Sequence, residues 1–247
     1  MSIDYVHAEN VHTLEGPRAA LPFLFPERRP SSLLDVGCGT GTWLKAALES
    51  GIAEIMGVDG IDLPADQLLI PRERFRHQDL TKEWDLKRRF DAALCLEVAE
   101  HLDPGQDDNL LDALTRHADT IVFSAACPGQ PGQHHVNCQW PAHWQQRFNE
   151  RGYVCDDSVR WRIWDDGRIE AWYRQNIFMA RKNAALAGKE PRIKAVLHPG
   201  LRMPAAPKPE HCFEEHVLQI ERGRMPVGWY LRVPAQAIAR KIRRPSA

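Results

Sequence analysis

The sequence lacks several features that would place it in a specialised class of protein. It has no C-x-x-C pair among its six cysteines, no apolar signal region and no apolar run long enough to span a membrane. It also lacks a charge excess, because 32 basic residues stand against 33 acidic ones for a net charge of −1. These absences argue against a disulfide scaffold and against a global field that draws the protein to nucleic acid or membrane. We expect a soluble, reduced, cytoplasmic protein whose binding contacts are local.

The chain length limits the number of domains. At 247 residues it is long enough for one well-buried domain with an extension, and short for two domains. Residues 1–30 are polar and rich in proline, with an apolar stripe that predicts a helical lid. Residues 184–247 predict an extension that begins as a surface arm and ends in a basic tail. No repeat is visible, and we expect the principal domain to be 31–183.

Apolar strands alternate with helical patterns through this domain. The predicted strands are 32–37, 54–59, 74–80, 90–96 and 119–126, with helices over 42–50, 105–118 and 141–152. Two later strands, 153–161 and 176–182, are expected to form a hairpin edge. Near-continuous apolar strands separated by helices predict an α/β fold, a Rossmann-like doubly wound sheet that is mostly parallel and covered on both faces.

The segment 35-DVGCGTG-41 places Gly37, Gly39 and Gly41 between a strand and a helix. In a doubly wound sheet this loop holds a nucleotide-like ligand. A dinucleotide fingerprint needs its third glycine at position 42, which is Thr42, so the spacing is G-x-G-x-G. Led by Asp35, this pattern resembles motif I of the class I S-adenosylmethionine (SAM)-dependent methyltransferases. The resemblance implies SAM as cofactor and a seven-stranded sheet whose last strand is antiparallel.

The same resemblance assigns further cofactor contacts. Asp59, followed by Gly60, ends the second strand at the position whose carboxylate accepts bonds from the ribose hydroxyls. Asp79 matches the acidic residue that accepts from the adenine amino group, with the Leu80 amide near the ring nitrogen. Trp43 has two interpretations, packing in the core or contact with the methionine portion of the cofactor.

The stretch 94-LCLEVAEHLDP-104 combines carboxylates and an imidazole after the fourth strand. The resemblance places Leu96 and Glu97 beside the cofactor. If the chain turns helically here, Glu97, Glu100 and His101 share a face and form three ligands of a site suited to Mg²⁺ or Mn²⁺. The alternative is a helix start, with the carboxylates favourably placed near its positive end and no metal.

A fourth ligand is expected from the later segment 127-CPGQPGQHHVNCQW-140, in which His134 and His135 are adjacent. In an extended loop only one of them faces inward. The order E-x-x-E-H, then His, then Trp140 resembles the divalent-metal site of the small-RNA 2′-hydroxyl methyltransferases, and E-x-x-E-H alone occurs in quinone-biosynthesis O-methyltransferases. The resemblance assigns His135 as metal ligand first and catalytic base second, with His134 as the alternative base. An RNA-binding module is not evident.

These residues favour oxygen as the methyl acceptor. A metal lowers the pKa of a bound hydroxyl, and a histidine can accept its proton. Residues 128–144 also resemble uncharacterised methyltransferases related to those that modify sugars and secondary metabolites. We therefore expect O-methylation of a small molecule or glycan. Two alternatives stay open: a metal-independent N- or O-methyltransferase with a histidine base, and a non-catalytic SAM-binding regulatory protein. The sequence does not indicate an oligomeric state.

Overall fold

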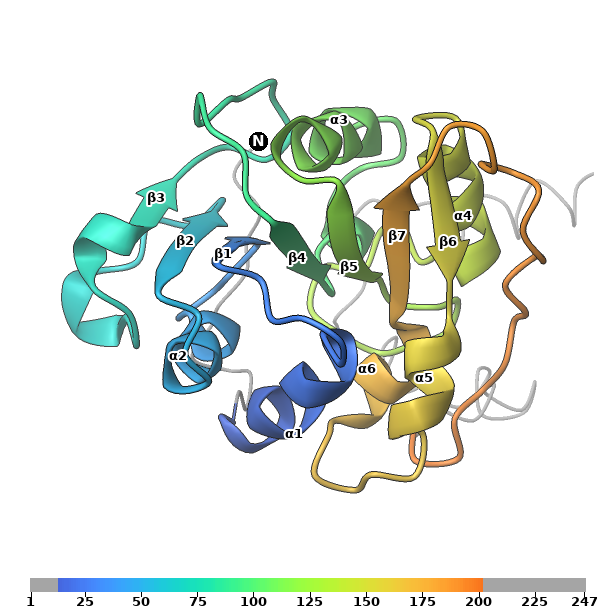
Figure 1. Cartoon of the computed structure of the whole chain (residues 1–247), viewed down its shortest axis with the longest axis horizontal. Coiled ribbons are helices and arrows are strands. Elements are labelled where there is room, and N and C mark those ends of the chain that lie inside the picture. The colour runs from blue at the N-terminus through green and yellow to red at the C-terminus, as the bar shows by residue number, and fades with distance from the viewer. Residues whose placement is uncertain (1–12, 202–247) are drawn as a thin grey trace, which may run out of the picture. The chain divides into compact units, whose positions relative to one another are not determined.

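A computed structural model describes residues 13–201, in which seven strands form one sheet between two layers of helices (Figure 1). The strands are β1 (Ser32–Val36), β2 (Glu54–Asp59), β3 (Phe75–His77), β4 (Ala92–Leu96), β5 (Thr120–Ser124), β6 (Tyr153–Asp156) and β7 (Phe178–Lys182). Their order across the sheet is β3-β2-β1-β4-β5-β7-β6. Neighbouring strands from β3 to β5 pair in parallel, and β7 pairs antiparallel with both β5 and β6. The predicted sheet, including its antiparallel last strand, is confirmed.

Six α-helices of the described residues cover the sheet on both faces (Figure 1). They are α1 (Glu15–Leu24), α2 (Thr42–Glu49), α3 (Asp107–His117), α4 (Pro141–Asn149), α5 (Ser158–Ile163) and α6 (Ala171–Asn176). Strand side chains alternate between the layers: Ala93 and Cys95 join the core cluster that contains residues of α3 and α4. Ala92 and Leu94 join the cluster that contains residues of α1, α2, α5 and α6. No helix within residues 13–201 is long and apolar enough to cross a membrane.

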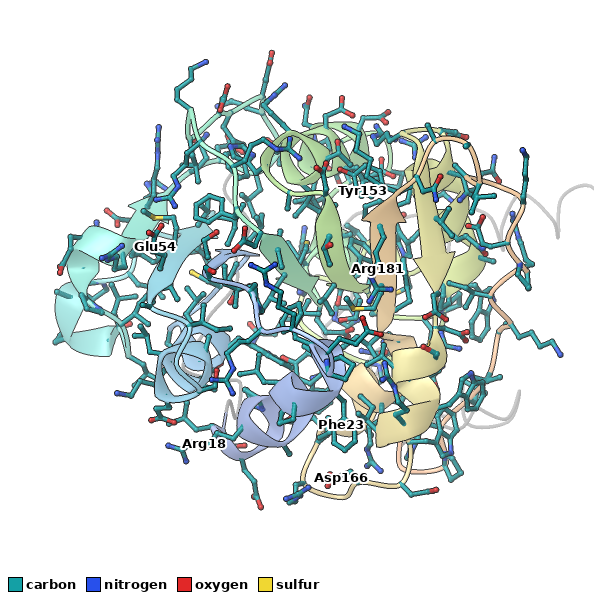
Figure 2. All side chains as sticks on the ribbon, in the orientation of Figure 1. Arg18, Phe23, Glu54, Tyr153, Asp166 and Arg181 are labelled. Carbon is teal, nitrogen blue, oxygen red and sulfur yellow. The ribbon has the colours of Figure 1, made fainter. Side chains whose placement is uncertain are left out.

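Aromatic rings fill the layer between the sheet and helices α3 and α4. The ring of Phe123 in β5 lies 5.4 Å from that of Trp144 and 5.3 Å from that of Phe148, centroid to centroid. Tyr153, at the start of β6, donates its hydroxyl to the Ala118 carbonyl oxygen at 2.6 Å (Figure 2). Buried aromatic groups of this size contribute a large part of the stability of a core. This layer therefore fixes β5, whose carboxyl end carries the loop over the predicted site.

Helix α1 forms part of the region that we expected to act as a lid. It packs against α2 and α5, with Leu21 and Leu24 buried. Arg18 on α1 donates Nε to Glu49 Oε2 at 2.8 Å and Nη2 to Glu49 Oε1 at 3.1 Å. This part of the region thus belongs to a helical layer. Residues 1–12 lie outside the described residues, and the lid stays a prediction.

The strand predicted over 153–161 is too long. It ends at Asp156, and the next residues form α5. The Asp156 carboxylate accepts hydrogen bonds from both the amide and the hydroxyl of Ser158, at 3.0 and 2.7 Å. Such local bonds from an aspartate favour a turn and a helix start over extended chain. Helices α5 and α6 therefore separate β6 from β7, although the two strands pair side by side as predicted.

The chain after β7, where we expected a linker or an arm lying on the surface, is hydrogen-bonded to the domain. Glu190 Oε1 accepts hydrogen bonds from Asn149 Nδ2 at 2.6 Å and from the Cys155 amide at 3.0 Å. The ring of His198 lies 4.4 Å from that of Trp164, so Trp164 packs against the extension. The predicted helix over 211–224 and the basic tail lie outside the described residues.

One buried histidine, His117, makes the stability of the fold depend on pH. The His117 side chain is fully buried and lies against the Trp84 ring, with centroids 4.8 Å apart. Its Nδ1 donates to the Ala113 carbonyl at 2.6 Å, and its Nε2 accepts from the Leu86 amide at 2.9 Å. Burial lowers the pKa of His117 below its ordinary value of 6.5. Because protonation is easier in the unfolded chain, the stabilisation by neutral His117 is complete above about pH 6.5 and declines as pH falls.

We expect the melting temperature to fall between pH 7.5 and pH 5.0, and the fall to be smaller in His117→Phe. Phenylalanine can stack on Trp84 and does not titrate, although the loss of two hydrogen bonds makes this variant less stable at every pH. Differential scanning calorimetry measures both effects. His77→Gln, at an exposed position, serves as the control and should keep the wild-type pH dependence. An unchanged fall in His117→Phe would contradict the assignment.

Candidate functional site

The residues predicted to bind the cofactor gather at one edge of the sheet. The parallel strands β1, β2 and β4 end there at Val36, Asp59 and Leu96, and the glycine loop, Gly60 and Glu97 follow them directly. In open α/β sheets, ligands bind in the crevice outside the carboxyl ends of the strands. The fold therefore brings together motifs that are up to sixty residues apart in the sequence.

The loop between β1 and α2 needs its glycines for backbone geometry. Gly37, Gly39 and Gly41 have φ values of 77°, 52° and 85°, which disfavour any residue with a side chain. The Gly37 amide donates to the Val58 carbonyl at 2.7 Å. A Cβ added at Gly37 would lie 2.3 Å from a methyl carbon of Val98. The loop is thus packed tightly between the ends of β2 and β4.

The Asp59 carboxylate is held by two backbone amides. Its Oδ2 accepts from the Gly39 amide and its Oδ1 from the Ile61 amide, both at 2.8 Å. The residue is buried, and no atom lies within 4 Å of the position that a Cβ on Gly60 would take. Each carboxylate oxygen can accept more than one hydrogen bond. The arrangement suits the predicted bonds to two neighbouring hydroxyls of a ribose.

Asp35, near the carboxyl end of β1, is buried with one carboxyl oxygen that lacks a hydrogen bond to any described residue. It is 2% exposed, and its Oδ2 has no hydrogen-bond partner among the described residues. Burial, followed by the negative charge of Asp59, raises the pKa of Asp35 to about 8. The Asp35 carboxyl is therefore mostly protonated at neutral pH.

Asp79, the predicted adenine contact, binds residues of the turn that directly follows it. Its carboxylate accepts from the Thr81 hydroxyl at 2.6 Å and forms an ion pair with Lys82 at 2.9 Å. These bonds, that of Thr81 first, lower the pKa of Asp79 to about 2. Leu80 beside it is buried. The carboxylate is ionised and fixed in place, and its contact with adenine stays a prediction.

Trp43 packs between two helices. Its side chain is buried, and its indole N–H donates to the Tyr173 hydroxyl at 3.3 Å. The two rings meet edge to face, with centroids 5.2 Å apart. These contacts join α2 to α6, and a contact of Trp43 with the cofactor stays a prediction.

The helical face predicted for the residues after β4 is wrong. Glu97 has a φ of 56°, in the left-handed region, and only Ala99–His101 form a short 3-10 helix. The Glu97 amide donates to the Ser124 carbonyl at 2.9 Å, which ties the chain to the end of β5. The left-handed residue turns the chain before the helix begins, so Glu97 does not share a helical face with Glu100 and His101. The Glu97 carboxyl nevertheless lies against that of Glu100, and the role of Glu97 as a metal ligand stays a prediction.

Two side-chain amides hold Glu97 instead. Gln130 Nε2 donates to Glu97 Oε2 at 2.7 Å, and Asn176 Nδ2 lies 3.2 Å from Glu97 Oε1. Asn176 Nδ2 also donates to Gln130 Oε1 at 2.9 Å. We call Gln130 and Asn176 the amide clamp. Burial raises the pKa of Glu97 to about 7, opposed by these hydrogen bonds.

Sequence analysis missed the amide clamp. Gln130 belongs to no motif, and Asn176 was assigned only as the first residue of a predicted strand. The one sequence signal is that Asn176 is a polar residue directly before an apolar run, 177-IFMA-180.

Glu100, His101 and His135 form a cluster with ligand atoms within 4.8 Å of one another. Glu100 is fully buried, and neither carboxylate oxygen has a hydrogen-bond partner among residues 13–201. Burial, followed by the charge of Glu97, raises the pKa of Glu100 well above its ordinary value. The Glu100 carbonyl accepts from the amides of Val136 and Asn137, at 2.9 and 3.0 Å. The loop after β5 thus lies against this turn.

The two imidazoles of the cluster have similar surroundings. Nδ1 of His101 faces the His134 carbonyl at 3.4 Å, and Nδ1 of His135 faces the Gln130 carbonyl at 3.0 Å. A carbonyl accepts from N–H, so both rings carry their proton on Nδ1 and their lone pair on Nε2. Burial, followed by the neighbouring His135, lowers the pKa of His101 to about 4, and burial lowers the pKa of His135. Both rings are neutral at neutral pH, as metal ligation requires.

His134 lies outside the cluster. It is exposed and has a φ of 48°, and its backbone carbonyl, described above, faces His101. His135 is half-buried and faces Glu100 and His101. This agrees with the expectation that only one of the two adjacent histidines faces inward. The role of His134 as an alternative base stays a prediction.

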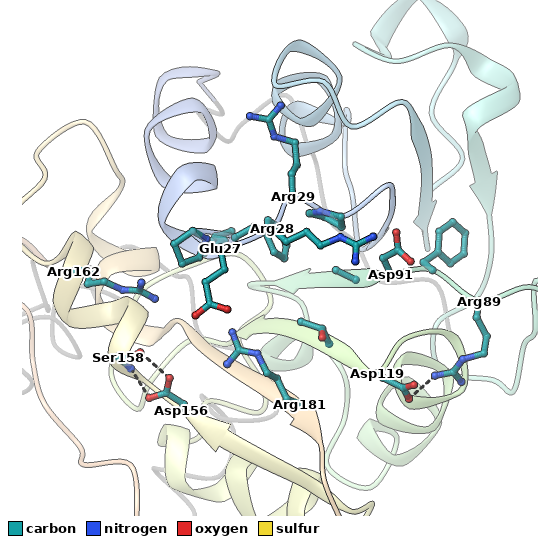
Figure 3. A pocket seen from close by; sticks show the side chains of 17 residues that line it. Glu27, Arg28, Arg29, Arg89, Asp91, Asp119, Asp156, Ser158, Arg162 and Arg181 are labelled. Atoms are coloured by element: carbon teal, nitrogen blue, oxygen red, sulfur yellow. Dashed lines mark hydrogen bonds and ion pairs between the residues drawn. The ribbon is translucent and has the colours of Figure 1, made fainter.

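A hollow of about 830 Å³ lies elsewhere on the sheet, near the starts of β4 and β5 (Figure 3). It is bordered by the chain after α1 and by α5. Its lining includes Arg28, Arg162 and Arg181 but none of the predicted site residues. The predicted chemistry therefore belongs to the opposite end of the parallel strands.

A family model described as methyltransferase domain matches residues 8–160, which is more than half of the chain. Among curated proteins, none matches this sequence significantly.

Solved structures share the fold at low sequence identity. The methyltransferase domain of bacterial CtHen1-C is 18% identical, with 70% of this chain and 100% of that chain covered and a TM-score of 0.50. The plantazolicin methyltransferase BpumL, in complex with a monoazolic analog and S-adenosylhomocysteine (SAH), is 15% identical over 69% and 83% of the two chains, with a TM-score of 0.50. Magnesium protoporphyrin IX methyltransferase from Synechocystis with bound SAM is 18% identical, with 69% of this chain and 79% of that chain covered and a TM-score of 0.49.

The family model and the fold agree with the geometry at the carboxyl edge of the sheet. The glycine loop with three positive φ values and the anchored Asp59 carboxylate are compatible with the predicted binding of a nucleoside cofactor. The chain therefore belongs to the methyltransferase domain family and is a class I SAM-dependent methyltransferase.

Proposed function

We propose that this methyltransferase acts on a hydroxyl oxygen of a small molecule or glycan, assisted by a divalent cation held by Glu100, His101 and His135. The observation that carries the proposal is the Glu100 carboxylate, fully buried without a hydrogen-bond partner and close to two neutral imidazoles. A buried carboxylate is costly unless it is paired or coordinates a metal. Two imidazoles and one carboxylate suit Mn²⁺ better than Mg²⁺, which prefers oxygen ligands.

The residues at the carboxyl ends of β3, β2 and β1 are proposed to bind successive parts of SAM. The Asp59 carboxylate accepts the ribose hydroxyls, and Asp79 accepts the adenine amino group. The glycine loop lets the backbone approach the cofactor, because its three glycines leave no side chain in the way. SAM supplies a methyl group on a sulfonium, which leaves as a neutral thioether and needs no acid. Positioning therefore carries much of the rate.

The cluster explains why oxygen is the favoured acceptor. A bound cation supplies a Lewis acid that lowers the pKa of a coordinated hydroxyl. An amine is nucleophilic without such help. Glu100, His101 and His135 would hold the cation, while the hydrogen bonds to Gln130 and His134 orient the two rings. A nearby uncoordinated basic group would take the hydroxyl proton, and His134 stays a candidate for this role.

The class of methyl acceptor is inferred from the net charge of the chain and from the ability of neighbouring hydroxyls to chelate a cation. With a net charge of −1, the chain has no overall attraction for a nucleic acid. Two neighbouring hydroxyls on a small molecule or glycan would chelate a cation and place one oxygen near the methyl group. The names of the similar structures include plantazolicin and magnesium protoporphyrin IX. At 15% and 18% sequence identity, these names do not identify the methyl acceptor of this chain.

Calorimetric titration with Mn²⁺ and Mg²⁺ tests the proposal on chelator-treated protein with SAH present. We expect stoichiometric Mn²⁺ binding by the wild type, and an affinity loss of about 100-fold or more in His135→Ala, which removes a ligand. His134→Asn is the matched control, because asparagine tolerates the left-handed backbone of that position. It should bind Mn²⁺ like the wild type.

Each contrary result has a clear meaning. Absence of Mn²⁺ binding in the wild type would end the metal proposal and restore amines as acceptors, with a histidine as base. Loss of binding in His134→Asn but not in His135→Ala would exchange the two histidines. A methyltransferase assay against catechols, sugars and amines then follows from the outcome.

A further inference from the structure

The hollow near the starts of β4 and β5 lies at the opposite end of the parallel strands from the predicted cofactor site. Its lining comes from the chain between α1 and β1, from the first residues of β4 and β5, from α5 and from β7 (Figure 3). Its volume of about 830 Å³ falls in the range of small-molecule sites, roughly 300–1,000 Å³. A ligand in this hollow would not be the molecule that receives the methyl group.

Three arginines of the lining have no acidic partner. Arg28 comes from the chain after α1, Arg162 from the last turn of α5 and Arg181 from β7. None of these side chains makes a hydrogen bond or an ion pair with another residue in 13–201. A guanidinium is always charged and carries five N–H donors in a planar fork. Three separate elements thus bring unsatisfied cationic groups to one concave surface.

Most carboxylates of the lining are held by other groups. Asp91 Oδ2 accepts hydrogen bonds from two backbone amides, at 2.7 and 3.1 Å. Asp119 pairs with Arg89 at 2.5 Å. Asp156 accepts from the residue that begins α5, as described above. These bonds direct the three carboxylates to the walls of the hollow and leave little negative charge to neutralise its arginines.

Glu27 is the one acidic residue of the lining without such a bond among the described residues. It is exposed, and in Figure 3 its carboxylate points into the hollow between the guanidinium groups of Arg162 and Arg181. It does not reach ion-pair distance from either arginine. An anion that contacts both guanidinium groups would therefore compete with Glu27 and make closer contacts than Glu27 makes.

We propose that the hollow binds a small phosphorylated molecule, with the phosphate group held by Arg162 and Arg181. Arg28 adds positive charge to the same surface. The inference concerns a second site, so it depends neither on the identity of the methyl acceptor nor on a cation at Glu100.

Phosphate fits the two arginines better than a carboxylate does. The guanidinium fork matches both groups, but a phosphate monoester carries up to two charges and three terminal oxygens. It can accept hydrogen bonds from two guanidinium groups that approach from different elements. A carboxylate has two oxygens, which one fork satisfies. The hollow already contains the Glu27 carboxylate, and this group leaves both arginines without a close partner.

One wall of the hollow is apolar. Phe25 and Pro30 are half-buried and Pro26 is exposed, and all three belong to the short chain between α1 and β1. Small-molecule sites combine apolar walls with a few convergent polar groups. This wall can cover the organic part of a ligand while the arginines hold its phosphate. The lining thus favours a phosphate ester over inorganic phosphate.

Calorimetric titration of the full-length, metal-free protein with phenyl phosphate, inorganic phosphate and benzoate tests the ligand class. We expect phenyl phosphate to bind with a dissociation constant of about 1 mM or below at low salt. Inorganic phosphate and benzoate should each bind more weakly, because the first lacks an apolar part and the second lacks a phosphate. Saturation with SAH should change the affinity for phenyl phosphate by less than about twofold, since the two sites lie at opposite ends of the strands.

Variants of opposite sign locate the site. Arg162→Gln and Arg181→Gln should each weaken phenyl phosphate binding about tenfold, the effect of losing a charged hydrogen bond. Glu27→Gln should strengthen it, because the competing carboxylate is removed. Arg76→Gln is the control for net charge: Arg76 is exposed on β3, at the far edge of the sheet, and its replacement should leave the affinity unchanged. Unchanged SAH binding reports that each variant is folded.

Several results would overturn the inference. The hollow is not an anion site if the wild type does not bind phenyl phosphate, or if Arg76→Gln weakens binding as much as Arg181→Gln. Loss of phenyl phosphate binding when SAH is added would place the ligand at the cofactor edge. Equal affinity for inorganic phosphate would assign the hollow to the simple anion. Tighter binding of a single-stranded RNA oligonucleotide, with a steep salt dependence, would replace the small molecule by a nucleic acid.

Discussion

Replacing Gly37 by alanine is expected to abolish measurable SAH binding and to lower the free energy of unfolding by about 2–4 kcal/mol. The φ of Gly37 is 77°, which an alanine adopts only with strain. Its Cβ would also lie 2.3 Å from a methyl carbon of Val98, so the loop or the end of β4 must shift. Either shift disturbs the backbone that the cofactor approaches. Calorimetric titration with SAH and denaturant unfolding measure the two effects.

A double variant separates the backbone strain at residue 37 from the steric clash with Val98. Adding Val98→Ala to Gly37→Ala removes the contact and should recover part of the stability, although SAH binding stays weak because the backbone strain remains. Gly60→Ala is the control for the cofactor edge, since a Cβ there meets no atom within 4 Å. It should cost much less stability. Wild-type SAH affinity in Gly37→Ala would show that the loop geometry is not needed for the cofactor.

The strands and the glycine loop could be predicted because their signals are local. Each residue of β1 and β4 is buried, and the sequence is apolar throughout β4 and apolar in β1 except at Ser32 and Asp35. The loop carries its glycines at the positions where the backbone has positive φ. The loop after β5 could be expected over the same edge, because the strands before it are parallel.

The errors fall where a distant contact decides the local structure. Glu97 reads as part of a helical turn, but its amide is bonded to Ser124 on another strand and its carboxylate to the amide clamp. Gln130 and Asn176 are 46 residues apart, and no spacing rule joins them. A sequence pattern identifies acidic and imidazole groups near an edge. Only three-dimensional contacts show that Glu100, His101 and His135 group together and that two side-chain amides hold Glu97.

Replacing Glu100 by methionine is expected to raise the stability of the metal-free protein at pH 7.5 by about 1–3 kcal/mol, and to abolish its stabilisation by Mn²⁺. The folded-state pKa of Glu100 is raised above the ordinary 4.5, chiefly by burial. The carboxyl therefore destabilises the fold increasingly as pH rises above about 4.5, where the unfolded chain loses the proton more easily. Methionine has a similar size and no such cost. Denaturant unfolding with a chelator measures the difference.

The gain should be larger at pH 7.5 than at pH 5.0, since the wild-type penalty grows over this range. Glu190→Met supplies a contrast of opposite sign, because hydrogen bonds from Asn149 and Cys155 lower the pKa of Glu190 despite its partial burial. That variant should lose stability at pH 7.5 relative to wild type. A metal-free Glu100→Met protein that is less stable than wild type would mean that Glu100 holds the fold together by itself. A carboxylate that weakens the empty fold but strengthens the metal-bound one is kept for binding, which is the behaviour the proposed cation site requires.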